Sequence, residues 1–256
     1  MRFQFAPMTD SPFIVLFIAL VVQWAAAYVG EAVGRKIRPI DSKERQDLDT
    51  VLTATLTLFA LIIGFSFSMA VTRYDQRKNY EEAEANAIGT EYLRADLLPA
   101  EDAAQVRALL RTYIDQRVQF YLGNGPRIGE ADPEGAKVQA GLWSAVSHAA
   151  SIGPTPVVAL AAAGMNDVLN SQGYTQAAWL NRIPLAAWTL MGLIGVFSNL
   201  LLGYRERSST RLAPLILPFI TSIAFFLIAD IDSPVHGVIH VGPHNLILAA
   251  QSMKAP

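Results

Sequence analysis

Three histidines near the carboxyl end have the spacing that most suggests a metal site. His236, His240 and His244 recur at every fourth residue, and Asp230 and Asp232 lie just before them. Imidazole and carboxylate groups together form a workable ligand set for zinc. Glycine and proline residues among the histidines disfavour the continuous helix that would align the three rings. We interpret the histidines as surface or packing residues and predict no metal ligand, with zinc binding as the alternative.

The sequence contains none of the motifs that commonly mark an enzyme. A glycine-rich phosphate loop, a serine nucleophile elbow and a histidine pair with an intervening acid are all absent. Cysteine is also absent, which excludes disulfides and thiolate chemistry. The net charge of -2 lacks the basic excess that a nucleic-acid-binding face needs. We therefore predict no catalytic residue, no cofactor and no nucleic-acid partner.

One face of the apolar segment 50–72 carries the most informative pattern. At about 100° per residue, small, hydroxylated and two large apolar side chains share one sector. Its members are Thr53, Thr57, Leu61, Gly64, Phe65, Ser68 and Thr72. As a pore wall, this face would offer hydroxyls to partly hydrated ions, and Leu61 with Phe65 would form an apolar constriction that gates by dewetting. The alternative is close helix packing through Gly64 and Ser68, which the pattern alone favours.

Four apolar segments are long enough to cross a bilayer. Hydrophobic residues make up 52% of the chain and charged residues 16%, less charge than soluble domains carry. The predicted spans are residues 11–30, 50–72, 184–202 and 212–229, each free of charged side chains. A cleavable signal peptide is the alternative for the first span. Pro214 and Pro218 predict a kinked or partly re-entrant fourth span.

A helical insert separates the second span from the third. The sequence favours helix from Arg73 through Leu98, so the second span is expected to continue out of the membrane as one long helix. Further helices are predicted at 101–122, 134–151 and 156–180, divided by turn-rich stretches. The predicted organisation is all-α, with spans one and two in 1–73, an extramembrane insert in 74–181, spans three and four in 182–230 and a tail in 231–256.

Charged residues follow the second span along the long helix. Arg77 and Glu81, and Lys78 and Glu82, are four residues apart, a spacing that supports ion pairs on an exposed helix. We interpret the run, which also includes Glu84, as a solvated helical face. Paired catalytic carboxylates are the alternative.

The residues around the end of the second span resemble a known family. The run from Gly64 to Ala70, followed by Arg73, Tyr74 and Asp75 and then by Arg77 and Lys78, resembles the signature of bestrophins. With the later run from Glu84 to Thr90, the sequence is similar to the prokaryotic bestrophin-like family, whose function is not established. Four spans, a helical insert and the Asp232-Ser233-Pro234 sequence after the last span fit the same plan.

The resemblance implies a pentameric channel, mostly for anions, in which one long helix per subunit lines a hydrophobic neck. Carried over to this sequence, the implied neck contains Thr57, Leu61 and Phe65, which lie on the face that periodicity indicates. Together with Ser68, these residues form the predicted pore wall. Arg73, Tyr74, Asp75 and Arg77 form the predicted pore exit. Thr57 replaces an apolar neck residue of bestrophins, and the acidic run of their calcium clasp is missing, so calcium gating is not expected.

The sidedness of the insert is predicted differently by charge and by resemblance. The basic loops 31–49 and 204–211 favour an external insert, because positive loops tend to stay in the cytoplasm. The family plan implies a cytoplasmic insert in a multi-pass protein of the cell (inner) membrane, and we follow it. The predicted function is a homo-oligomeric, anion-conducting channel with lipid, small ions and other copies of itself as partners. A non-conducting membrane scaffold or sensor, whose insert binds a partner, is the alternative.

Overall fold

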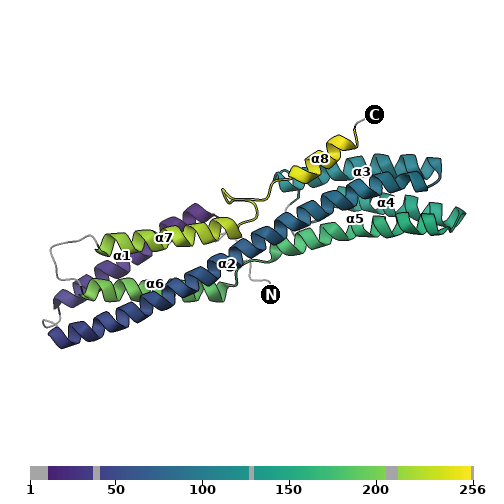
Figure 1. Cartoon of the computed structure of the whole chain (residues 1–256). Helices are drawn as coiled ribbons and strands as arrows, with labels where there is room; N and C mark the ends of the chain where they lie inside the picture. The colour runs from purple at the N-terminus through teal and green to yellow at the C-terminus, as the bar shows by residue number, and fades with distance from the viewer. Residues whose placement is uncertain (1–10, 37–40, 127–129, 206–212, 255–256) are drawn as a thin grey trace. The chain divides into compact units, whose positions relative to one another are not determined.

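The structure, a computed structural model, describes residues 11–36, 41–126, 130–205 and 213–254 (Figure 1). Helices dominate this part of the chain, and it contains no β-strand. The helices are α1 (Pro12–Lys36), α2 (Ser42–Arg94), α3 (Ala100–Tyr121), α4 (Pro133–Ile152), α5 (Pro156–Leu180), α6 (Leu185–Arg205), α7 (Ala213–Asp232) and α8 (His244–Ser252), with a 3₁₀ turn η1 (Ala95–Leu97) after α2. The predicted all-α class is therefore confirmed.

Contacts divide the chain into two units. The first unit comprises Met1–Arg73 and Arg182–His240, and the second comprises Tyr74–Asn181 and Val241–Pro256. The predicted single long helix is confirmed, because α2 runs without interruption from Ser42 to Arg94. The second unit therefore contains the latter part of α2 together with α3, α4, α5 and α8.

Four helical stretches are long and apolar enough to cross a membrane. They are Pro12–Lys36, Ser42–Leu97, Pro156–Arg205 and Leu215–Asp232, and each contains most or all of one predicted span. This confirms the prediction of about four transmembrane helices. The fourth is one helix, α7, that continues through Pro218. In α7, the carbonyl of Pro218 accepts hydrogen bonds from the hydroxyls of Thr221 and Ser222, which follow it on the same helix.

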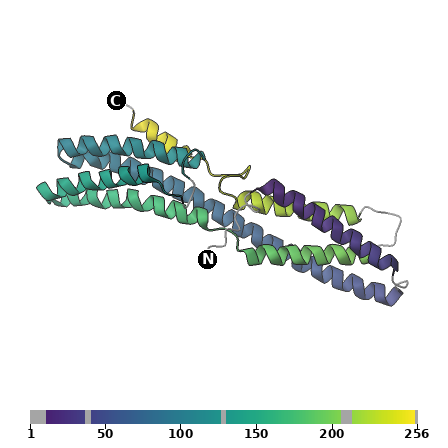
Figure 2. The same ribbon diagram turned by 180° about the vertical axis from the view of Figure 1, so that it is seen from behind.

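In the first unit, α1 lies against α6 and α7 (Figure 2). Glycine allows α1 and α6 to approach at backbone distance. A Cβ added at Gly203 would lie 1.9 Å from the carbonyl oxygen of Ala27, and one added at Gly30 would lie 2.1 Å from that of Leu200. Gly30 and Gly34 have the spacing of a small-xxx-small motif, so membrane helices associate here through small residues. This packing places α1 within the folded bundle, as a resident first span requires.

Replacing Gly203 with alanine is expected to separate α1 from α6. The new methyl group would overlap the backbone of α1, and overpacking of this kind costs about 1–3 kcal/mol. Gly192 on the same helix is the matched control, because a Cβ there has nothing within 4 Å. Thermal unfolding in detergent should show a clear loss for Gly203→Ala and little change for Gly192→Ala. Equal melting of the two variants would contradict the packing.

A polar cluster also joins α1, α6 and α7. The amide oxygen of Gln23 accepts hydrogen bonds from Asn199, at 2.9 Å, and from the hydroxyl of Thr221. All three side chains are buried. Hydrogen bonds between membrane helices contribute modestly but fix which faces meet.

The acidic run after the second span is partly internal, so its interpretation as a solvated face is wrong for Glu81 and Glu84. Glu81 accepts hydrogen bonds from the backbone N–H of Leu246, at 3.0 Å, and from the side chain of Asn245. These donors lie in the first turn of α8, where a carboxylate offsets unpaired N–H groups. Glu81 therefore anchors α8 to α2 within the second unit.

Candidate functional site

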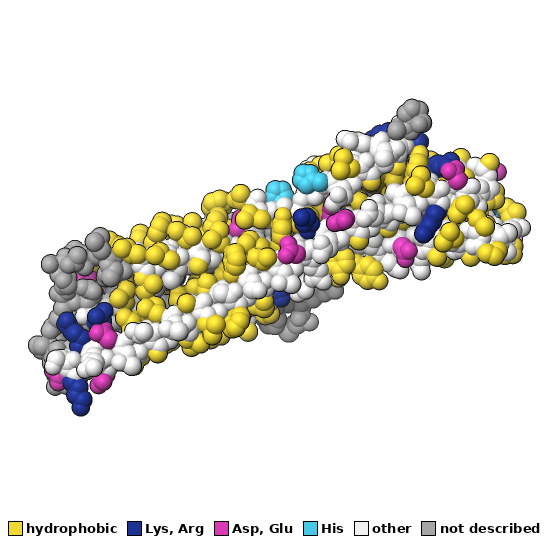
Figure 3. All heavy atoms as spheres, viewed as in Figure 1, with side chains coloured by type: hydrophobic (Ala, Val, Ile, Leu, Met, Phe, Trp, Pro, Cys, Tyr) yellow, Lys and Arg dark blue, Asp and Glu magenta, His cyan; other side chains and the backbone are white. Residues whose placement is uncertain are grey.

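The face of α2 that the periodicity indicates is exposed in the chain. Leu61 is 54% exposed and Phe65 is 62% exposed, and Thr57 and Ser68 beside them are also exposed. A Cβ added at Gly64 would meet nothing within 4 Å. The small-residue packing that Gly64 and Ser68 offer is therefore not used within the described part of the chain. Figure 3 shows the hydrophobic side chains that cover much of the visible face of the first unit.

Two hydroxyl groups on this face form hydrogen bonds to the preceding turn of α2. The hydroxyl of Thr57 donates to the carbonyl oxygen of Thr53 at 2.8 Å, and that of Thr72 donates to Ser68 at 2.9 Å. Such bonds to the preceding turn let threonine sit in a membrane helix without a partner helix. The hydroxyl oxygens keep lone pairs directed outward, so they can still accept hydrogen bonds from water or contact cations.

The opposite face of α2 packs into the first unit. Phe59 is 2% exposed and meets Phe225 of α7 edge-on, with ring centroids 6.1 Å apart. Ser66 and Ala70 are also buried on this side. At about 100° per residue, the buried and exposed sets are centred roughly 180° apart around the helix. The chain therefore covers one side of α2 and leaves the predicted pore side uncovered.

The signature residues at the end of the second span point in different directions. Asp75 is exposed, whereas Arg77 is 2% exposed. Tyr74 packs against the hydrophobic core of the second unit. Arg73 is partly buried, and its Nη1 atom has no hydrogen-bond partner among the described residues. Of these four residues, only Asp75 belongs to the exposed face of α2.

A family model for the Bestrophin-like domain matches residues 21–246. The chain belongs to the bestrophin-like family. Solved structures agree on the fold: variants of a bacterial bestrophin homologue from Klebsiella pneumoniae superimpose with TM-scores of 0.67 and 0.63 at 11% and 12% identity. The first match covers 93% of this chain and 93% of the other, and the second covers 95% and 99%. No curated protein matches the sequence significantly.

The carboxylates near the three histidines of this bestrophin-like chain have structural partners. Asp230 accepts hydrogen bonds from the backbone N–H groups of Val238, at 2.7 Å, and Ile239, at 2.9 Å. Asp232 accepts a hydrogen bond from Arg182 at 2.9 Å. No group of three or more metal-binding side chains occurs in the described ranges. Asp230 thus fixes the segment that follows α7, and Asp232 ties the end of α7 to the segment that precedes α6.

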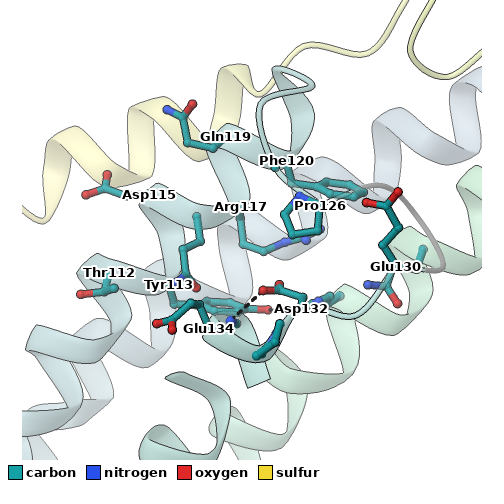
Figure 4. Close-up of a pocket in the computed structure, with 16 residues that line it drawn as sticks. Thr112, Tyr113, Asp115, Arg117, Gln119, Phe120, Pro126, Glu130, Asp132 and Glu134 are labelled. Atoms are coloured by element: carbon teal, nitrogen blue, oxygen red, sulfur yellow. Dashed lines mark hydrogen bonds between the residues drawn. The ribbon is translucent and has the colours of Figure 1, made fainter. Parts of the chain in front are cut away.

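The second unit of the bestrophin-like chain contains a cavity that sequence reasoning did not anticipate (Figure 4). Its volume is about 600 Å³. Residues of α3, α4 and α5 line it, together with the segment that precedes α4. Its acidic lining residues are Asp115, Glu130, Asp132 and Glu134. Asp132 caps α4 by accepting a hydrogen bond from the N–H of Gly135 at 2.9 Å, so one of these carboxylates is structural.

Sequence reasoning also missed the residues that hold the bestrophin-like fold together. The Gly30 and Gly34 spacing was visible in the sequence as a small-xxx-small pair. Gln23 could have been noticed as a lone amide in an apolar span. The partner of Glu84 could not have been found in this way, because it lies 33 residues away on α3.

Proposed function

We propose that this protein is a homopentameric ion channel whose pore is lined by α2. The observation that carries the proposal is the uncovered face of α2 opposite its packed face. Thr57, Leu61, Phe65 and Ser68 form the proposed pore wall. Bestrophins are known as anion channels, and membership of their wider family supports conduction as the function.

A water-filled pore enclosed by other copies of the same chain best explains this face. Lipid tails gain little from a stripe of hydroxyl groups and a glycine, whereas water and ions gain hydrogen-bonding partners there. In a ring of subunits, the exposed side of each α2 faces the axis and the packed side faces its own bundle. An uncovered polar stripe on an otherwise apolar helix is what such a ring requires.

Leu61 and Phe65 form the proposed neck. They lie one helical turn apart on the same side of α2, so in a ring they give two adjacent apolar layers. A narrow apolar pore segment closes by losing its water, which makes these layers a barrier that small changes in diameter can open.

The insert is proposed to lie outside the membrane, on the cytoplasmic side of the cell (inner) membrane. Within it, residues 74–181 form the body and residues 241–256 pack with them as part of the second unit. Anion conduction is the selectivity that the family implies.

Shortening the neck is expected to increase conductance. Phe65→Ala removes a large apolar group from the pore and lowers the cost of wetting it, so planar-bilayer recordings should show a higher open probability. Phe67→Ala is the matched control, because Phe67 is also exposed but lies about 100° away from the centre of the face. Native mass measurement of each variant would verify that the oligomer persists.

Two outcomes would contradict the proposed channel. A native mass that corresponds to one or two subunits would contradict it, because so few copies of α2 cannot enclose such a pore. Silence of the wild-type protein and of both variants in every salt would favour the non-conducting scaffold. Identical currents for Phe65→Ala and Phe67→Ala, different from those of the wild type, would remove Phe65 from the neck.

A further inference from the structure

We infer that the pore mouth next to the insert selects cations, through carboxylates of Asp75 and Glu82 carried on the pore-facing side of α2. The inference rests on the proposed function, because it requires α2 to line a pore. It departs from the anion conduction that the family implies.

The helical periodicity of α2 can be followed beyond the predicted second span. Since α2 is one helix, its periodicity can be followed from the neck into the second unit. The exposed positions that fall in the same sector are Asp75, Asn79, Glu82, Ala83, Asn86, Thr90 and Leu93. Two of them are acidic and none is basic. Asp75 and Glu82 are two helical turns apart, about 10 Å along the axis.

The basic residues of this region point elsewhere. Arg77 is 2% exposed and lies on the packed side of α2, about 180° from the centre of the stripe. Arg73 lies near that side too and is partly buried. Lys78 is exposed, but its position is about 80° from the centre of the stripe. Burial and helix geometry therefore remove most of the positive charge of this region from the pore-facing side of α2.

The remaining carboxylates of the acidic run are internal to the second unit. Glu81, Glu84 and Glu91 are each no more than 1% exposed. In contrast, neither Asp75 nor Glu82 forms an ion pair or hydrogen bond within the part of the chain that the structure describes, and the predicted pair between Lys78 and Glu82 is not formed there. The carboxylates of Asp75 and Glu82 are therefore exposed and have no ion-pair partner among the described residues.

In a ring of subunits, these residues give two successive layers of carboxylates. Rings of Asp or Glu side chains favour cations and repel anions in a pore. The two layers are about 10 Å apart, which is close to the distance over which physiological salt screens charge. An ion between them therefore experiences the electrostatic potential of both layers.

Reversal potentials of the purified full-length protein in planar bilayers with a KCl gradient test the inference. The wild type is expected to reverse toward the potassium equilibrium potential. Asp75→Asn with Glu82→Gln should shift the reversal toward zero, and Glu82→Lys should shift it further toward chloride. Glu101→Lys is the matched control for Glu82→Lys, since Glu101 is exposed on α3 and the two substitutions change the net charge by the same amount.

Failure of the proposed selectivity can be distinguished from failure of the proposed channel. Currents that reverse at the chloride potential and do not respond to the Asp75 and Glu82 variants would overturn the selectivity while leaving the channel intact. Equal shifts for Glu101→Lys and Glu82→Lys would also overturn it, because net charge rather than position would then be responsible. Absence of any current would overturn the channel and the inference together.

Discussion

Replacing Arg117 with methionine is expected to destabilise the second unit by about 3–5 kcal/mol, the usual cost of breaking a buried ion pair. Arg117 is 4% exposed, and its Nε donates to the fully buried carboxylate of Glu84. The hydroxyl of Thr175 donates to the same carboxylate at 3.1 Å. Methionine keeps much of the side-chain volume but leaves Glu84 as a buried charge without its counter-ion.

The charges of this network are fixed by their surroundings. Burial alone would lower the pKa of Arg117, but the charge and hydrogen bonds of Glu84 outweigh it and raise the pKa. Burial raises the pKa of Tyr121, so its hydroxyl remains protonated and donates to Glu84 at 3.5 Å. Arg117 therefore stays charged at ordinary pH values, so the arginine does not lose its charge by titration.

Arg107→Met is the matched control for this substitution. Arg107 pairs with Asp96 on the surface of the same unit, with side chains 31% and 68% exposed, and such pairs contribute about 0–1 kcal/mol. Hydrogen exchange of α3 and α5 amides in the full-length protein would measure both variants. Arg117→Met should accelerate exchange strongly, and adding Glu84→Leu should restore part of the protection. Equal effects of the two arginine variants would contradict the role of the buried pair.

The second unit is expected to lose stability between about pH 4.5 and pH 8 because of Glu91. Burial raises the pKa of Glu91 from 4.5 to about 8, and Asp167 adds to the effect, whereas Arg94 opposes it. Both carboxylate oxygens are buried without a hydrogen-bond partner among the described residues. The side chain lies against Gly164, where an added Cβ would be 2.0 Å from one of its oxygens.

The direction of the pH dependence follows from proton uptake. Between the two pKa values the folded protein holds a proton on Glu91 that the unfolded chain has lost, so stability falls as the pH rises. Since one pKa unit corresponds to about 1.4 kcal/mol, the total is several kcal/mol. Below about pH 4.5 the carboxyl is protonated in both states, and its contribution no longer changes with pH.

Glu91→Gln removes the titrating group and should flatten this part of the pH profile. Melting temperatures of the wild type and the variant, measured in detergent across the range, should diverge as the pH rises, with the variant losing less. Glu101→Gln serves as the exposed control and should follow the wild type. Parallel profiles for the wild type and Glu91→Gln would show that Glu91 does not carry a raised pKa.

The helices were predictable because their signals are local. The predicted helix 156–180 and the observed α5 coincide, since Thr155 caps the helix, accepting a hydrogen bond from Val158, and Pro156 begins it. Glu81 and Glu84 were misjudged for the opposite reason. Their partners lie on α8 and α3, and a helical wheel cannot tell a carboxylate that faces solvent from one that faces a distant arginine.

Periodicity identified a distinctive face of α2 but not its surroundings. Thr57, Leu61 and Phe65 share one side by helical geometry alone. Whether that side packs within the chain depends on where the other spans lie, and only the buried position of Phe59 against Phe225 decides it. The role of this face as a pore wall stays a prediction.

Cysteine modification at the proposed pore wall tests the channel most directly, and the natural absence of cysteine provides a clean background. Ser68→Cys and Phe67→Cys place thiols on adjacent exposed residues about 100° apart around α2. A charged, water-soluble thiol reagent should change the current through Ser68→Cys channels and leave that of Phe67→Cys channels unaltered. An unaltered Ser68→Cys current, with modification of the thiol verified by mass, would contradict a pore lined by this face.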